Sequence, residues 1–117
     1  MTGMTFDVVG LCRREPGSGA VAAAILAASP GAQVDFDADR QLIRLHRPDG
    51  RPLLTIESAR LVRVPGEARR LLGVDVPDPV WWVESRAPDE DPEAEAVARA
   101  FTGALVAATG GRSWSSR

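Results

Sequence analysis

Two side chains of this chain could do covalent chemistry, the single cysteine Cys12 and the single histidine His46. An imidazole can activate a thiol as a nucleophile, and the positive charges of Arg13 and Arg14 would lower the thiol pKa. Such a pair needs a third group to orient the imidazole, and no local signature links Cys12 to His46. We therefore interpret Cys12 as a small core residue at the end of a strand, and we assign no catalytic residue.

Acidic side chains between residues 35 and 57 raise the question of a metal site. Five side chains could converge on adjacent strands: Asp35, Asp37, Asp39, His46 and Glu57. Oxygen-rich clusters can hold calcium or magnesium, but "DFDADR" lacks the glycine and the terminal glutamate of an EF-hand loop. One histidine and one cysteine are too few of the usual ligands for a zinc site. Alternating aspartates are typical of the solvent face of a strand, so we expect no metal and no cofactor.

The stretch "PVWWVES" places two tryptophans side by side in a predicted strand. Neighbouring side chains of a strand point to opposite faces, so only one of the two tryptophans can enter a given core layer. We expect Trp81 in the core and Trp82 on the outer face. An exposed tryptophan among arginines is typical of a binding surface. The predicted partner-binding residues are Trp82, Arg44, His46, Glu84 and Arg86. The alternative is that the tail or a short helix covers Trp82.

Apolar periodicity and turn residues define the elements that would position these side chains. Strands are expected at 5–12, 33–37, 43–46, 52–57 and 80–85, with a further strand within 59–64 and an optional edge strand in the tail. The first of them is nearly all apolar, which predicts a strand covered on both faces. Helices are expected at 18–29, 65–73 and 92–109. Ser18 is the predicted cap of the first helix, and Asp91 and Pro92 start the last one.

This order predicts an α+β fold, a two-layer sandwich. A mainly antiparallel sheet would carry the two longer helices packed on one face. The acidic stretch "PDEDPEAE" is interpreted as a helix start rather than as a docking surface. The 117 residues fit a single globular domain spanning 1–117, with no repeat or linker that would divide it.

Composition narrows the classes of partner. The net charge is −2, and all 14 basic residues are arginine, which argues against nucleic acid as a partner. We find no apolar run long enough to span a bilayer and no secretory signal, and we expect a cytoplasmic protein. A lone cysteine fits a reducing compartment.

Three segments together resemble a known family: "GRPLLTIE", "VPGEARRLLG" and "VWWVESRA". The layout that contains them is similar to that of uncharacterised actinobacterial proteins encoded near type VII secretion genes. Members of that family are longer, so this chain would be a short member or one domain. None of the segments is a catalytic motif. The resemblance therefore implies a cellular context and an accessory or partner-binding role rather than a reaction.

The sequence favours a non-catalytic protein-interaction module, with a secretion-system accessory factor or chaperone as its specific form. The expected partner is a protein or a second copy, and a homodimer formed by sheet-to-sheet or edge pairing stays open. The alternative is a small enzyme or ligand-binding domain that uses Cys12 or the Asp35/His46/Glu57 face.

Overall fold

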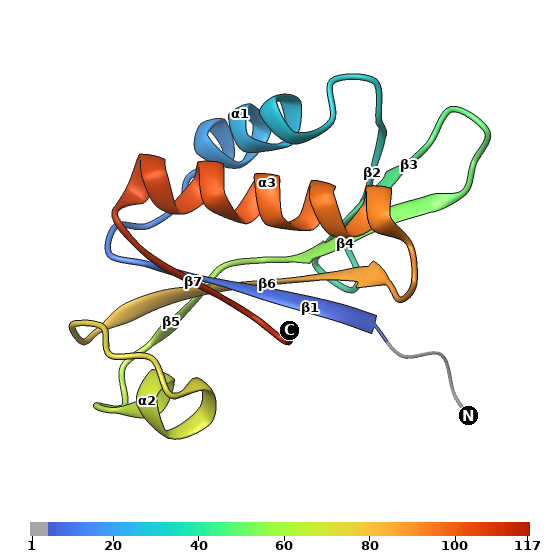
Figure 1. Cartoon of the computed structure of the whole chain (residues 1–117). Coiled ribbons are helices and arrows are strands. Elements are labelled where there is room, and N and C mark those ends of the chain that lie inside the picture. The colour runs from blue at the N-terminus through green and yellow to red at the C-terminus, as the bar shows by residue number, and fades with distance from the viewer. Residues whose placement is uncertain (1–4) are drawn as a thin grey trace.

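The computed structural model describes residues 5–117 and has an α+β architecture with two layers (Figure 1). The strands are β1 (Thr5–Cys12), β2 (Gln33–Asp37), β3 (Leu42–His46), β4 (Pro52–Glu57), β5 (Arg60–Val62), β6 (Val80–Pro88) and β7 (Gly111–Ser115). The helices are α1 (Ser18–Ala28), α2 (Glu67–Leu72) and α3 (Pro92–Thr109). The predicted fold class is confirmed.

All seven strands form one antiparallel sheet in the order β2-β3-β4-β6-β1-β7, and β5 also pairs with β6. From Ile56 to Arg60 the chain advances four residues while its partner β6 advances three, from Ser85 to Trp82. This one-residue bulge bends the strand at residues 57–59 and separates β4 from β5. The tail forms β7 beside β1, so the optional edge strand is present.

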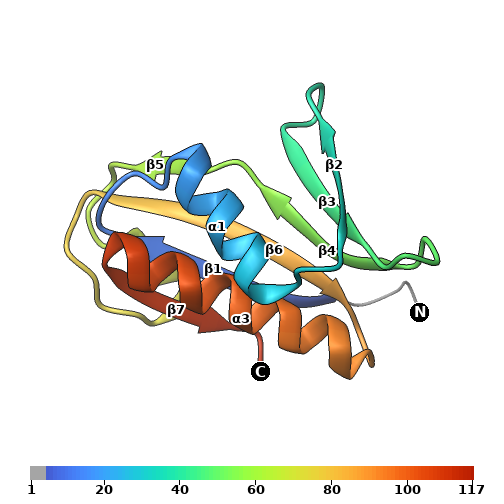
Figure 2. The same cartoon turned by 90° about the horizontal axis from the view of Figure 1, so that it is seen from above.

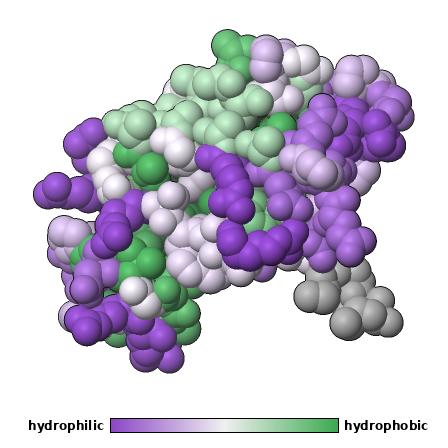
Figure 3. Space-filling model, in the orientation of Figure 1, coloured by the Kyte–Doolittle hydropathy of each residue, from purple (hydrophilic) through white to green (hydrophobic). Residues whose placement is uncertain are grey.

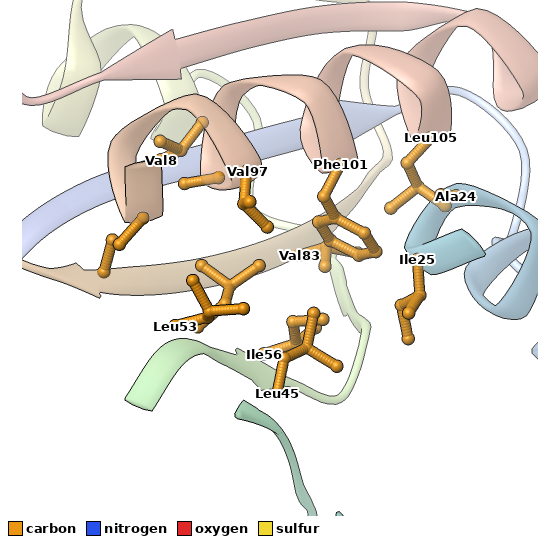
Figure 4. Close-up of a cluster of buried hydrophobic side chains, with 14 of the residues drawn as sticks. Val8, Ala24, Ile25, Leu45, Leu53, Ile56, Val83, Val97, Phe101 and Leu105 are labelled. Atoms are coloured by element: carbon orange, nitrogen blue, oxygen red, sulfur yellow. The ribbon is translucent and has the colours of Figure 1, made fainter. Parts of the chain in front are cut away.

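The main core lies between the sheet and the two longer helices, which cover the same face (Figures 1 and 2). Phe101 and Leu105 of α3 meet Ile25 of α1 and Ile56 of β4 over this face (Figure 4). α3 packs closely on β1 at Gly10, where an added Cβ would lie 3.4 Å from the methyl group of Thr102, at the limit of ordinary van der Waals contact. We call the opposite face of the sheet the outer face.

The start of α3 matches the prediction. The Asp91 side chain accepts a hydrogen bond from the backbone N–H of Ala94 at 3.1 Å, and Pro92 opens the first turn. The acidic stretch is therefore a helix cap. The predicted cap of α1 is wrong: Ser18 is the first helical residue, and Gly17 holds the cap position without a side-chain hydrogen bond.

A smaller second core lies on the outer face, beneath α2 (Figure 1). It buries Val9, Leu11, Ala68, Val80 and Trp82. Since the main core and this second core lie on opposite faces, β1 is covered on both, as its apolar sequence predicts. In the described residues, 5–117, no helix is long and apolar enough to cross a membrane.

Candidate functional site

Trp82 is a core residue and not a surface residue, with only 4% of its area exposed. The α2 residues Ala68 and Leu72 cover it together with Trp114 of β7. The Arg60 guanidinium lies 5.2 Å from the ring centroid, and the indole N–H donates to Glu84 at 3.3 Å. The expectation of an exposed Trp82 is wrong, because both the short helix and the tail fold over it. Trp81 contacts the main core, as expected.

The four polar residues predicted to surround Trp82 do share the outer face. Arg44 lies opposite Thr55, and Thr55 opposite Arg86, so their side chains form one row across three strands. Arg86 donates to Glu57 and, at 3.3 Å, to Glu84. These charges neutralise one another within the sheet. His46 lies two residues from Arg44 on the same side of β3 and is half-buried.

Arg44 also forms a cross-strand ion pair. Its guanidinium lies 3.3 Å from the carboxylate of Asp37, which Arg40 also contacts. The backbone N–H of Arg40 and the Arg44 side chain hold the pKa of Asp37 below its ordinary value. The face that bears the predicted partner-binding residues thus pairs the charges of Arg44, Glu84 and Arg86, and within residues 5–117 it has no exposed aromatic side chain.

Cys12 and His46 cannot act as a pair. Cys12 is fully buried in the core under α3, whereas His46 alternates with the buried Leu45 and so points to the outer face. Burial raises the pKa of the Cys12 thiol, and a hydrogen bond with Thr109 only partly offsets this effect. A buried thiol with a raised pKa is a poor nucleophile.

The Asp35/His46/Glu57 set is spread over the outer face. Glu57 lies opposite Leu42, at the far end of β3 from His46, which is about 13 Å along a strand. Over residues 5–117, no group of three or more histidine, cysteine, aspartate or glutamate side chains could hold a metal ion. The geometry therefore favours neither form of the enzyme alternative.

A different surface stands out on the helical side of the sheet. Two adjoining hollows of about 330 and about 300 Å³ lie between α1 and the β2–β3 hairpin. Ala22, Ile25 and Val34 line both hollows. We call this continuous feature the α1–β2 groove. Its floor includes Ile43, Ile56 and Val83. Figure 2 shows why it is open: α1 and α3 lie over the middle of the sheet, and the hairpin extends beyond them.

Large apolar side chains surround the α1–β2 groove. Leu26 on α1 is 63% exposed, and Val34 and Phe36 on β2 are 58% and 61% exposed. The surface over α1 is green in Figure 3. Val34 and Phe36 lie opposite Leu45 and Ile43, which places both on the helical side of the sheet. Exposed apolar residues clustered around a groove mark an interaction site.

The groove is almost free of charge. No residue of α1 is charged. Glu57 is the one ionisable residue that lines the groove in the described part of the chain, and its carboxylate is held by Arg86. The sequence carried a signal for this site: "SGAVAAAILAA" is apolar on every side, and such a helix is normally covered all round.

Comparison with protein-family models, curated proteins and solved structures gives no match to this chain. Its function must therefore follow from the chemistry of its own surfaces.

Proposed function

We propose that this protein is a non-catalytic interaction module that binds an apolar segment of a partner polypeptide in the α1–β2 groove. One observation carries the proposal: Leu26 and Val34 line a groove whose walls hold almost no charge, yet both are largely exposed, and the exposed Phe36 lies beside them, opposite the lining residue Ile43. Burial of a large apolar side chain that was fully exposed stabilises a complex by about 1.5–3 kcal/mol. Leu26, Val34 and Phe36 are 58–63% exposed, so each can contribute only part of that free energy.

A secretion accessory factor or chaperone is the specific form that we favour. An apolar groove suits a factor that holds an apolar segment of a client before the client reaches its destination. The resemblance of "GRPLLTIE", "VPGEARRLLG" and "VWWVESRA" to proteins encoded near type VII secretion genes supports that context, with the cytoplasm as its place.

The test compares two matched substitutions. Phe36→Asp places a charge beside the groove, opposite the lining residue Ile43. Leu71→Asp places the same charge on α2, on the opposite face of the sheet, where Leu71 is 52% exposed (Figure 1). Tagged wild type and both variants are purified from cells of the source organism, and the bound proteins are identified by mass spectrometry. Each candidate partner is then titrated against the three purified proteins.

We expect one partner to bind wild type and Leu71→Asp alike and to bind Phe36→Asp at least tenfold more weakly. Equal binding by all three proteins would show that the groove is not the site. Since both side chains are largely exposed, neither substitution should alter the fold, and circular dichroism checks this point.

A further inference from the structure

We infer, on the basis of the proposed function, that the partner segment binds as an extended strand added to the free edge of β2. The segment would alternate apolar and basic residues. Its apolar side chains would lie beside Val34 and Phe36 on the groove side, and its basic side chains would face the aspartates of β2 on the outer face.

The edge of β2 is open to pairing. β2 is the last strand of the sheet and pairs only with β3, in a continuous register from Gln33–His46 to Asp37–Leu42. It contains no proline, no lysine and no bulge, and the two charges by which this short strand is protected, Asp35 and Asp37, both lie on the outer face. Its outward backbone groups can therefore accept a further strand, as in other complexes formed by strand addition.

The side chains of β2 specify what such a strand must carry. Val34 and Phe36 lie on the helical side, and Gln33, Asp35 and Asp37 lie on the outer face. Residues directly opposite each other in a pair of strands interact strongly, and opposite charges there are favourable. A strand with apolar residues on one face and lysine or arginine on the other therefore complements β2 in both respects.

Asp35 is the centre of this recognition. It lies opposite Arg44, but the Arg44 guanidinium bonds to Asp37 instead. Within residues 5–117, Asp35 has no hydrogen bond or ion pair from its side chain, and the residue is exposed. Its carboxylate is available to a basic residue of the partner.

The same charges disfavour a second copy of this chain on the edge. If two β2 strands paired antiparallel about Asp35, that residue would face itself. If they paired about Phe36, Asp35 would face Asp37 of the other copy. Like charges directly opposite each other are destabilising. The acidic outer face of β2 thus disfavours self-pairing in these two registers and favours a basic partner strand.

Three capped seven-residue peptides test the pattern. The first alternates valine and lysine, the second alternates valine and glutamate, and the third has the composition of the first with its valines at helical spacing. Each is titrated into isotopically labelled protein, and amide shifts are followed by NMR. The proteins are wild type, Asp35→Lys, Asp35→Asn and the control Asp49→Lys, which makes the same charge change in the turn between β3 and β4.

We expect the valine–lysine peptide to bind best to wild type and to shift the amides of residues 33–37. Asp35→Lys should weaken it about fivefold and strengthen the valine–glutamate peptide by a similar factor, while Asp49→Lys leaves both unchanged. Asp35→Asn should give an intermediate loss. Added salt should weaken the lysine peptide, since the contact is exposed.

Three results would overturn strand addition. The helically spaced peptide could bind the groove more tightly than the alternating one. Asp35→Lys could leave the ratio of the affinities for the valine–lysine and valine–glutamate peptides unchanged. Light scattering could show a wild-type dimer whose β2 amides are protected, which would assign the edge to a second copy. The first two results leave the groove as the interaction site, whereas equal partner binding by wild type and Phe36→Asp would contradict the proposed function itself.

Discussion

At the scale of single residues, Arg47 ties the end of β3 to the start of α3. Its side chain is almost fully buried, and it donates to Asp91 at 2.8 and 2.9 Å and to Glu93 at 2.6 Å. A further bond reaches the backbone carbonyl of Pro52 at 3.0 Å. Breaking a buried ion pair leaves one partner uncompensated, so this cluster fixes how α3 sits on the sheet.

The Asp91 carboxylate makes the stability of the protein depend on pH. The backbone N–H of Ala94 and then the Arg47 guanidinium hold the pKa of Asp91 below its ordinary value in the folded protein. The unfolded chain therefore binds a proton first, at about pH 4. The contribution of Asp91 is fully present above that pH and is lost as the pH falls through the lower, folded pKa.

We expect Asp91→Asn to lower the urea midpoint at pH 7 and to flatten its decline between pH 5 and pH 2, relative to wild type. Asp49→Asn is a useful comparison because Asp49 also has a lowered pKa, from the backbone N–H and side chain of Arg51, but lies in an exposed turn. If the urea midpoints of wild type and Asp91→Asn declined in parallel between pH 5 and pH 2, Asp91 would not have this role.

Cys12 gives a second prediction at this scale. Because the thiol is buried and its pKa is raised by that burial, it should not react with Ellman's reagent in the folded protein at pH 8. In 6 M guanidinium chloride the same protein should release about one equivalent of thionitrobenzoate. Rapid reaction without denaturant would mean that Cys12 is accessible and would reopen the enzyme alternative.

At the scale of elements, α2 and the C-terminal strand β7 cover the second core. Trp82 is the largest side chain in that core and touches both. Replacement of a buried tryptophan by alanine costs about 3–5 kcal/mol, since it removes apolar contact and leaves a cavity. Trp82→Ala therefore removes a core side chain. A loss of binding in this variant would not identify a binding surface, because the fold itself is destabilised.

We expect Trp82→Ala to lower the free energy of unfolding by about 3–5 kcal/mol in a urea titration. Leu71→Ala on α2 should change it by less than about 0.5 kcal/mol, because Leu71 is exposed. Equal stability of the two variants would contradict the placement of Trp82 beneath α2.

Local pattern was sufficient for most elements. The alternation in "QVDFD" and "PLLTIE", the Asp91–Pro92 helix start and the glycines that end α2 and α3 all lie within a few residues of the feature they determine. The cover over Trp82 could not be predicted in the same way. It depends on Ala68, Leu72 and Trp114, whose meeting requires the long-range pairing of β6 with β1 and of β1 with β7.

The candidate site was harder to predict for a related reason. The order of the strands places β2 at the edge of the sheet, where Val34 and Phe36 are left largely exposed although β3 beside it packs into the main core. Alternation alone shows that Val34 and Phe36 share a face, but only the sheet order shows that no helix of residues 5–117 covers it. The absence of charge along α1 was the local sign that its outer surface is unusually apolar.

At the scale of the whole molecule, the two faces of the sheet differ in how completely they are covered. On the outer face, α2 and the tail cover one region, and ion pairs such as Arg86–Glu57 neutralise much of the remainder, with Asp35 on the edge strand left unpaired within residues 5–117. On the helical face, α1 and α3 leave the groove beside β2 open. The main open apolar surface therefore lies on the helical side, next to the edge strand that carries Asp35.

The most direct test of this account is amide hydrogen exchange of the protein alone and saturated with its purified partner. We predict that the partner slows exchange in residues 33–37 of β2 and along α1, with no change in α2. Protection confined to α2 or to the outer-face strands, with β2 exchanging at its free rate, would contradict the claim that the α1–β2 groove is the binding site.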